Sequence, residues 1–88
     1  MKLATIIGTV TATAKDAQLA GHKLLLCNII DGAGAVIEPG VVAADTVGAG
    51  TGETVLITFG SAARLPAGTA GIPVDAVITA IVDNIKIS

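Results

Sequence analysis

Charged residues are scarce in this chain of 88 residues, and aromatic and cysteine residues are almost absent. Charged residues make up 14% of the chain, against about 25% in ordinary globular domains. Hydrophobic residues make up 52%. Intrinsic disorder is excluded, because disordered chains combine low hydrophobicity with high charge. The shortage of charge also indicates that partners cover part of the surface that a lone chain would expose.

The scarcity of positive charge and of aromatic rings argues against a nucleic-acid partner. The five Lys and Arg residues are scattered, the net charge is −2, and Phe59 is the only aromatic residue. Phosphate binding calls for a basic stripe, and binding of single strands calls for several stacking rings. No apolar run approaches the 18 residues of a membrane-spanning helix, so we also expect no membrane partner.

Cysteine and histidine occur once each, which limits metal and nucleophile chemistry. Cys27 cannot form an intrachain disulfide or a thiolate zinc cluster, and a single cysteine fits a reducing, intracellular compartment. It lies in the most apolar run, so we expect a buried, unreactive thiol. His22 alone cannot build a multi-histidine metal site within one chain, and we expect it in a solvent-facing loop. We predict no metal and no cofactor.

The chain is instead rich in β-branched side chains: valine, isoleucine and threonine account for 30 of the 88 residues. Such residues favour strands. The residues between the turn signals predict strands over residues 2–13, 23–30, 35–37, 41–46, 54–59 and 74–87. The run at 23–30 is apolar throughout, which indicates a strand buried on both faces. The last segment also fits helical spacing, and we assign it to a strand because the rest of the chain is β.

Two local features complete the expected architecture. Gly8, inside the first strand, predicts a bulge or sharp bend. Residues 60–64 predict one short helical turn, with Ser61 as its N-cap. About five strands in so short a chain favour a single domain, residues 1–88, folded as a small closed or partly open all-β barrel.

The glycine-rich segment 48–53 is the first candidate site. A loop of this kind can hold an anion on its backbone N–H groups. A nucleotide-binding loop has Lys and then Ser or Thr after its last glycine, whereas here Glu53 follows Gly52. We therefore favour a structural loop, in which the Glu53 carboxylate accepts hydrogen bonds from the amides of the loop itself. We expect Gly50 to need a positive φ and a close approach to a neighbour.

Carboxylates and the single arginine give the remaining candidates. Asp45, Asp75 and Asp83 flank apolar strands and could serve as acid/base groups or metal ligands. They are not clustered and no histidine joins them, so turn and ion-pair roles are preferred. Asp31 precedes a glycine and reads as a turn residue. Arg64 is either solvated or pairs with Asp75 or Glu53 of a neighbouring subunit, since arginine binds carboxylates in bidentate fashion.

Several blocks of the chain, in order, resemble one known family. The most specific is Gly-Ala-Gly-Thr-Gly-Glu-Thr-Val at 48–55, joined to Gly-Ser-Ala-Ala-Arg at 60–64. The further blocks lie at 8–15, 19–25, 44–47, 73–76 and 81–83. Together they resemble the vertex proteins of bacterial microcompartment shells, the family of the carboxysome and ethanolamine-utilisation pentamers.

The resemblance implies a fold, an assembly and a location. The fold would be a five-stranded OB-like β-barrel with one short helical turn, assembling as a cyclic homopentamer. The pentamer would cap the five-fold corners of a cytoplasmic shell that hexameric proteins otherwise tile, and it would have no catalytic role. The loop Gly48, Ala49, Gly50, Thr51, Gly52 and Glu53 would lie near the five-fold axis and the subunit contacts.

Two other functions remain open from the residues alone. One is a small-ligand or oligonucleotide-binding OB-type barrel, which the lack of aromatic and basic residues disfavours. The other is an enzyme, which would depend on Asp45 or Asp75.

Overall fold

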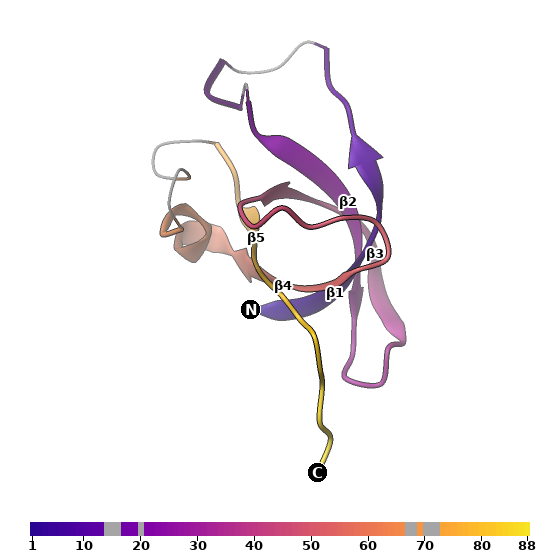
Figure 1. Cartoon of the computed structure of the whole chain (residues 1–88). Helices are drawn as coiled ribbons and strands as arrows, with labels where there is room; N and C mark the ends of the chain where they lie inside the picture. Colours follow the sequence, from indigo (N-terminus) through magenta and orange to yellow (C-terminus); the bar gives the residue numbers. More distant parts are fainter. Residues whose placement is uncertain (14–16, 20, 67–68, 70–72) are drawn as a thin grey trace.

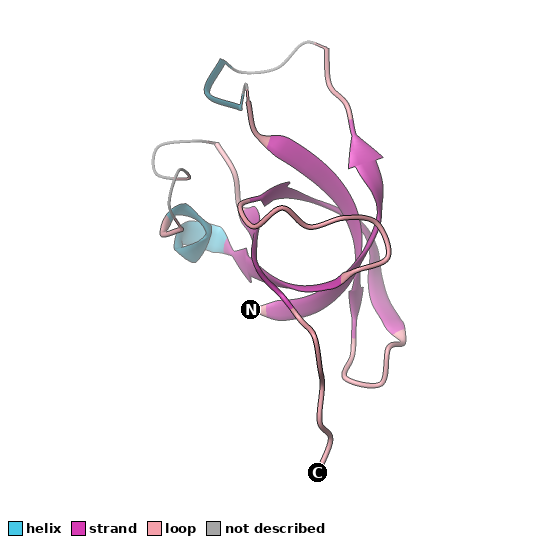
Figure 2. Cartoon of the chain, viewed as in Figure 1, coloured by secondary structure: helices cyan, strands magenta, loops and turns pink. Residues whose placement is uncertain are grey.

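The computed structural model describes residues 1–13, 17–19, 21–66, 69 and 73–88. Its five strands close into one small barrel, and two short 3-10 helices, η1 and η2, lie in the connections (Figures 1 and 2). The elements are β1 (Lys2–Val10), η1 (Ala17–Leu19), β2 (Lys23–Ile30), β3 (Val36–Asp45), β4 (Thr54–Phe59), η2 (Gly60–Arg64) and β5 (Ala76–Ile81). The expected all-β, five-stranded, OB-like barrel is confirmed. None of the helices among these residues is long and apolar enough to cross a membrane.

The strands close in the order β1-β2-β3-β5-β4, and β4 returns to β1. All neighbours are antiparallel except β3 and β5, which are parallel and meet only at Ala44–Val77 and Asp45–Ile78. The register of β1 against β2 shifts between Ile6 and Gly8, which confirms the predicted irregularity at Gly8. A bulge bends the strand and increases its twist; the pairing of β1 with β4, over Lys2–Thr5, lies before this point.

The barrel interior is filled by alternate residues of the five strands. Its largest fully buried side chains include Ile6, Leu25, Ile29, Ile57 and Ile78. A second, smaller cluster lies outside the barrel wall, where Ala63 of η2 packs over Ala44 and Val77. The outer cluster arises because successive residues of a strand point to opposite faces.

The predicted break at 38–40 is wrong, because β3 runs without interruption from Val36 to Asp45. Pro39 fits an edge strand, where its missing N–H removes no ladder hydrogen bond. Gly40 has a φ of 73°, and its N–H donates to the Asn28 side-chain oxygen at 3.2 Å instead of to a backbone carbonyl. The Pro-Gly pair therefore distorts the strand locally without ending it.

The predicted bounds of β1 and β5 also differ. β1 ends at Val10, three residues before the predicted end, and β5 covers only Ala76–Ile81 of the predicted 74–87. After Val82, whose N–H donates to the Thr54 carbonyl at 2.8 Å, no strand pairs with the chain among the described residues. The predicted Ser61 N-cap is wrong: η2 begins one residue earlier, Phe59 is its N-cap, and no side chain caps it.

Candidate functional site

The loop between β3 and β4 is organised by Asp45, the last residue of β3. The Val47 N–H donates to Asp45 Oδ1 at 3.0 Å, and the Ala49 N–H donates to Asp45 Oδ2 at 2.9 Å. The Asp45 side chain is only 2% exposed. Short polar side chains often bind the amides that follow them in this way and so fix a turn. The preferred turn role of Asp45 is confirmed.

Two further charged side chains close the same loop. Glu53 Oε1 accepts the Gly50 N–H at 2.7 Å, as expected from the sequence. Lys23 Nζ, at the start of β2, donates to the Ala49 carbonyl at 2.8 Å and lies 4.0 Å from Asp45 Oδ2. Hydrogen bonds to charged groups are stronger than neutral ones, so this loop is held more firmly than its glycine content suggests. The role of Lys23 was not predicted, because its partners lie more than 20 residues away in the sequence.

The loop is also tied to the barrel. The Gly52 N–H donates to the Ile6 carbonyl at 2.8 Å, and the Ile6 N–H donates to the Glu53 carbonyl at 3.0 Å. These two bonds extend the β1–β4 ladder into the loop and fix residues 46–53 beside β1. The amides of Val47, Ala49 and Gly50 all bind carboxylates of this chain, so they have no N–H left for an anion.

The glycine requirement lies at two positions other than the one predicted. Gly48 and Gly52 have φ values of 77° and 90°, which only glycine adopts readily. Gly50 does not have a positive φ, and a Cβ built on it would lie 3.6 Å from Glu53 Oε1, an ordinary contact. Within this protomer, the expectation that Gly50 needs a positive φ is wrong.

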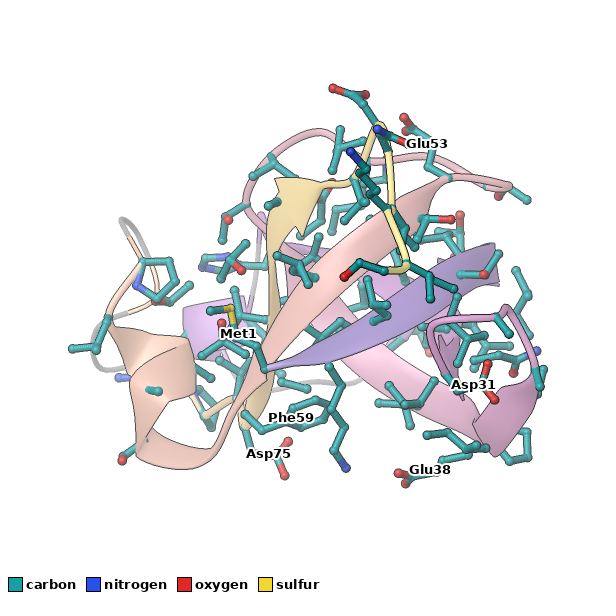
Figure 3. All side chains as sticks on the ribbon, turned by 90° about the horizontal axis from the view of Figure 1, so that it is seen from below. Met1, Asp31, Glu38, Glu53, Phe59 and Asp75 are labelled. Atoms are coloured by element: carbon teal, nitrogen blue, oxygen red, sulfur yellow. The ribbon has the colours of Figure 1, made fainter. Side chains whose placement is uncertain are left out.

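The other predicted carboxylates do not converge. Figure 3 shows Asp31, Glu53 and Asp75 at separate places around the barrel. Asp31 accepts two backbone N–H groups of its own turn, which confirms its predicted role. Asp83 lies in the exposed C-terminal segment. No group of three His, Cys, Asp or Glu side chains that could hold a metal occurs in the part of the chain that the structure describes.

Cys27 and His22 belong to no metal-binding cluster in the described part of the chain. Cys27 is buried, and burial raises the pKa of its thiol, with the negative charge of Asp45 raising it further. The His22 N–H donates to the Leu19 carbonyl at 3.1 Å, and the residue is half-buried. The Arg64 side chain lies outside the described part of the chain, so its predicted ion pair with Asp75 stays a prediction.

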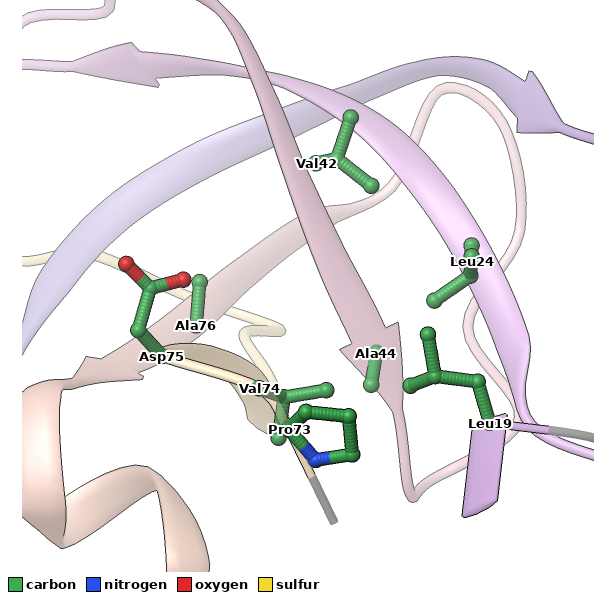
Figure 4. A pocket seen from close by; sticks show the side chains of 8 residues that line it. All are labelled: Leu19, Leu24, Val42, Ala44, Pro73, Val74, Asp75 and Ala76. Atoms are coloured by element: carbon green, nitrogen blue, oxygen red, sulfur yellow. The ribbon is translucent and has the colours of Figure 1, made fainter. Parts of the chain in front are cut away.

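An apolar groove on the outside of the barrel was not predicted as a site. It has a volume of about 220 Å³, and Asp75 is the only charged residue among the described residues that line it (Figure 4). Its walls come from η1, β2, β3, the approach to β5 and β5 itself: Leu19, Leu24, Val42, Ala44, Pro73, Val74, Asp75 and Ala76. Small-molecule sites usually measure 300–1,000 Å³, so this groove is smaller than a typical ligand pocket.

Exposed apolar side chains are frequent for so small a chain. Within residues 1–13, 17–19, 21–66, 69 and 73–88, ten large hydrophobic residues are exposed, among them Val42 and, in the C-terminal segment, Ile85 and Ile87. Large exposed apolar areas mark surfaces where proteins meet. The described surface therefore resembles that of a subunit more than that of a free monomer.

Comparison with known proteins shows to which family this chain is similar. Residues 1–83 match the family model described as "Ethanolamine utilisation protein EutN/carboxysome". The carboxysome shell vertex protein CcmL of Nostoc is 48% identical over 88 residues, covering 99% of this chain and 87% of that protein. The microcompartment shell vertex protein EutN of Salmonella typhimurium is 41% identical over 85 residues, covering 97% and 86%.

A solved structure extends the comparison to the fold. The pentameric microcompartment shell protein GrpN of Rhodospirillum rubrum superposes with a TM-score of 0.86 at 36% identity, covering 100% of this chain and 99% of that one. The match spans nearly the whole chain in sequence and in structure. The chain belongs to the EutN/CcmL family, whose relatives named above are vertex and pentameric proteins of microcompartment shells.

Proposed function

We propose that this chain is a structural subunit of a bacterial microcompartment shell, where it forms a homopentamer at the five-fold vertices. The observation that carries the proposal is the match, over almost the full length of both chains, to proteins named shell vertex proteins. The mechanism is geometric. A flat hexagonal layer cannot close on itself, and a five-fold unit at each corner introduces the curvature that closes it.

The surface supports assembly into a ring. A cyclic pentamer needs two different patches on each subunit, because its interfaces are head-to-tail. A standard interface buries about 800 Å² on each partner, so two such patches would cover about a third of the 5026 Å² surface of this chain. That burial accounts for the low content of charged residues and the exposed apolar side chains.

The loop of residues 48–53 fits a position near the five-fold axis. Its side chains are small apart from Glu53, and Glu53 binds the loop itself. Its backbone is fixed by Asp45 and Lys23, so crowding five copies around an axis costs little further ordering. We also propose that Arg64 of one subunit pairs with Asp75 of the next, since Asp75 is exposed at the rim of the groove.

The proposed partners are further copies of this chain and the hexameric proteins that tile the shell, with no nucleic acid, membrane, cofactor or catalysed reaction. Phe59, the one aromatic residue, packs against the core with Lys2 Nζ 5.1 Å from its ring centre. A base therefore finds no open stacking platform at Phe59. Both carboxylate oxygens of Asp45 accept hydrogen bonds from loop amides. Asp45 is therefore poorly suited to catalysis, and it is one of the two residues on which an enzyme would depend.

Co-assembly with a hexameric shell protein tests the proposal. The hexameric protein is produced with and without this chain, and the particles are imaged by electron microscopy. We expect closed polyhedra with this chain at their corners when both are present, and open sheets or tubes when it is omitted. Shells that close equally well in its absence, or particles in which it occupies no corner, would contradict the function.

A further inference from the structure

The outer wall of the barrel carries an uncharged apolar surface across three strands. Two rows of directly opposed residues form it: Val10, Leu24 and Ala44 in one row, and Gly8, Leu26 and Val42 in the next. We name these six residues the outer apolar face. Opposed residues of neighbouring strands share one side of a sheet, and this side is opposite to that of the buried Leu25 and Ala43, which belong to the interior core.

This face lacks the polar cover that a solvated sheet shows. Strands with one wet face alternate apolar and polar residues, whereas β2 is apolar on both sides from Leu24 to Cys27. η2 covers Ala44 of this face and the neighbouring residue Val77, but Val42 is 44% exposed and Leu24 and Leu26 are only half-buried. The sequence predicts that both faces of β2 are buried. Within one protomer, only the inner face is fully buried.

The chain also carries a segment that has apolar side chains and no partner strand. Residues 82–88, here called the tail, leave the barrel as an extended segment (Figure 1). Ile85 and Ile87 are 41% and 72% exposed. In an extended chain they point to the same side as Asp83, while Val82, Asn84, Lys86 and Ser88 point to the other. Beyond Asp83 the segment therefore has one apolar and one polar side, which suits docking on an apolar sheet face.

The tail does not cover the outer apolar face of its own protomer at the groove. In Figure 1 the C-terminus and η1, whose Leu19 lines the groove, lie at opposite ends of the molecule. That molecule measures 43 Å along its longest axis and 24 and 20 Å along the others. A second copy, placed beside the first, can bring an identical tail to this face.

The tail carries two charged residues, Asp83 and Lys86. Lys86 lies on the side opposite to Ile85 and Ile87, so docking of these two isoleucines leaves its ammonium group in solvent.

We propose that, in the pentamer, the tail of each subunit docks through Ile85 and Ile87 on the outer apolar face of the next subunit. The inference rests on the proposed function and adds the surfaces that join the subunits. The tail and the face are different patches of one chain, as a head-to-tail ring requires.

Native mass spectrometry of four variants tests the pairing. The donor variant I85D/I87D places two acids on the apolar side of the tail. Its matched control N84D/S88D adds the same charge on the polar side. The acceptor variant V42D changes the face, with the strand control I37D, which is exposed on β3 outside the face. We expect pentamers for the wild type and both controls, and monomers for the donor and acceptor variants, with association weakened roughly a hundredfold or more.

Mixing the two impaired variants gives the sharpest result. The donor variant keeps an intact face and V42D keeps an intact tail, so one working interface forms between them. We expect a heterodimer of about 17 kDa, twice the 8.6 kDa chain, and no ring. The milder V42T, which changes polarity with little change in shape, is used with it in case V42D does not fold, and we expect it to weaken assembly about tenfold.

The outcomes separate this inference from the proposed function. A pentameric wild type with a pentameric I85D/I87D variant, or with folded acceptor variants that assemble normally, overturns the docking and leaves the function standing. Impaired variants that form no heterodimer when mixed show that the two surfaces do not meet. A wild type that is itself monomeric overturns the function and the docking together.

Discussion

Removing the Asp45 carboxylate is expected to destabilise the chain far more than removing the similar carboxylate of Asp31. Each aspartate accepts backbone N–H groups from the residues two and four positions ahead of it. Asp31 Oδ1 accepts those of Ala33 and Ala35 at 2.9 and 3.0 Å, in a fully exposed turn. Asp45 makes the same pair of bonds with a side chain that is 2% exposed.

The magnitude follows from which groups water can reach after the substitution. In Asp45→Ala the N–H of Ala49, a residue that is 0% exposed, loses its acceptor. A buried donor without a partner costs about 1–3 kcal/mol. Val47 is exposed, so water replaces its lost bond at a cost of about 1 kcal/mol or less. Lys23 is half exposed and is hydrated again. We expect a loss of about 2–4 kcal/mol for Asp45→Ala, and about 1 kcal/mol or less for Asp31→Ala.

Urea unfolding at one fixed protomer concentration measures the difference, because the stability of an oligomer depends on concentration. With an m value of about 2 kcal/mol/M, the midpoint falls by about 1–2 M for Asp45→Ala and by less than about 0.5 M for Asp31→Ala. Equal decreases for the two variants would refute the argument that burial of the Ala49 amide sets the cost.

Three further outcomes are expected. Gly48→Ala and Gly52→Ala should each lower the free energy of unfolding by about 1–2 kcal/mol, because both glycines have positive φ values. Gly50→Ala should change it little. A Gly50→Ala variant that unfolds in urea as easily as Gly48→Ala would contradict this expectation. Because the pKa of the Cys27 thiol is raised, less thiolate is present at pH 8 than in a free cysteine. A thiol reagent should therefore label the chain unfolded in urea but not the folded chain. Rapid labelling of the folded chain would contradict the burial of Cys27. Arg64→Asp and Asp75→Arg should each weaken pentamer association about two- to fivefold. The double exchange should restore association, as measured by native mass spectrometry. Additive losses in the double variant would show that the two residues do not pair.

Much of the barrel could be predicted because most strands carry their own pattern. The ranges of β2 and β4 are confirmed residue for residue, since both are apolar runs with clear turn residues on either side. The break expected at Glu38–Gly40 was wrong because Pro and Gly end a strand only where the lost hydrogen bond is needed. At an edge, with Asn28 supplying an acceptor for Gly40, the strand continues.

The ends of β1 and β5 could not be read from the residues. Residues 82–88 have the composition of a strand, but no neighbouring strand pairs with them within the described part of the chain. A strand depends on its partner for hydrogen bonds, so local preference alone cannot fix where it stops. The helical spacing of residues 74–87 arises from the same apolar side chains, which alternate between the core and the outer cluster in β5.

The position of the candidate loop and the role of Glu53 were predicted. The contacts of Lys23 that hold the loop against the barrel were not. Glu53 lies three residues from Gly50, so their bond is visible in the sequence. Lys23 reaches the loop only because the barrel brings the start of β2 beside the end of β3. The outer apolar face could not be predicted for the same reason, since the register of three strands brings its residues together.

Cryo-electron microscopy of the purified chain tests the central claim most directly. The account predicts particles with five-fold symmetry, built from five copies of the 8.6 kDa chain and about 43 kDa in mass, with residues 48–53 of each copy nearest the axis. Well-folded particles with another symmetry, or single barrels with no rotational symmetry, would contradict it.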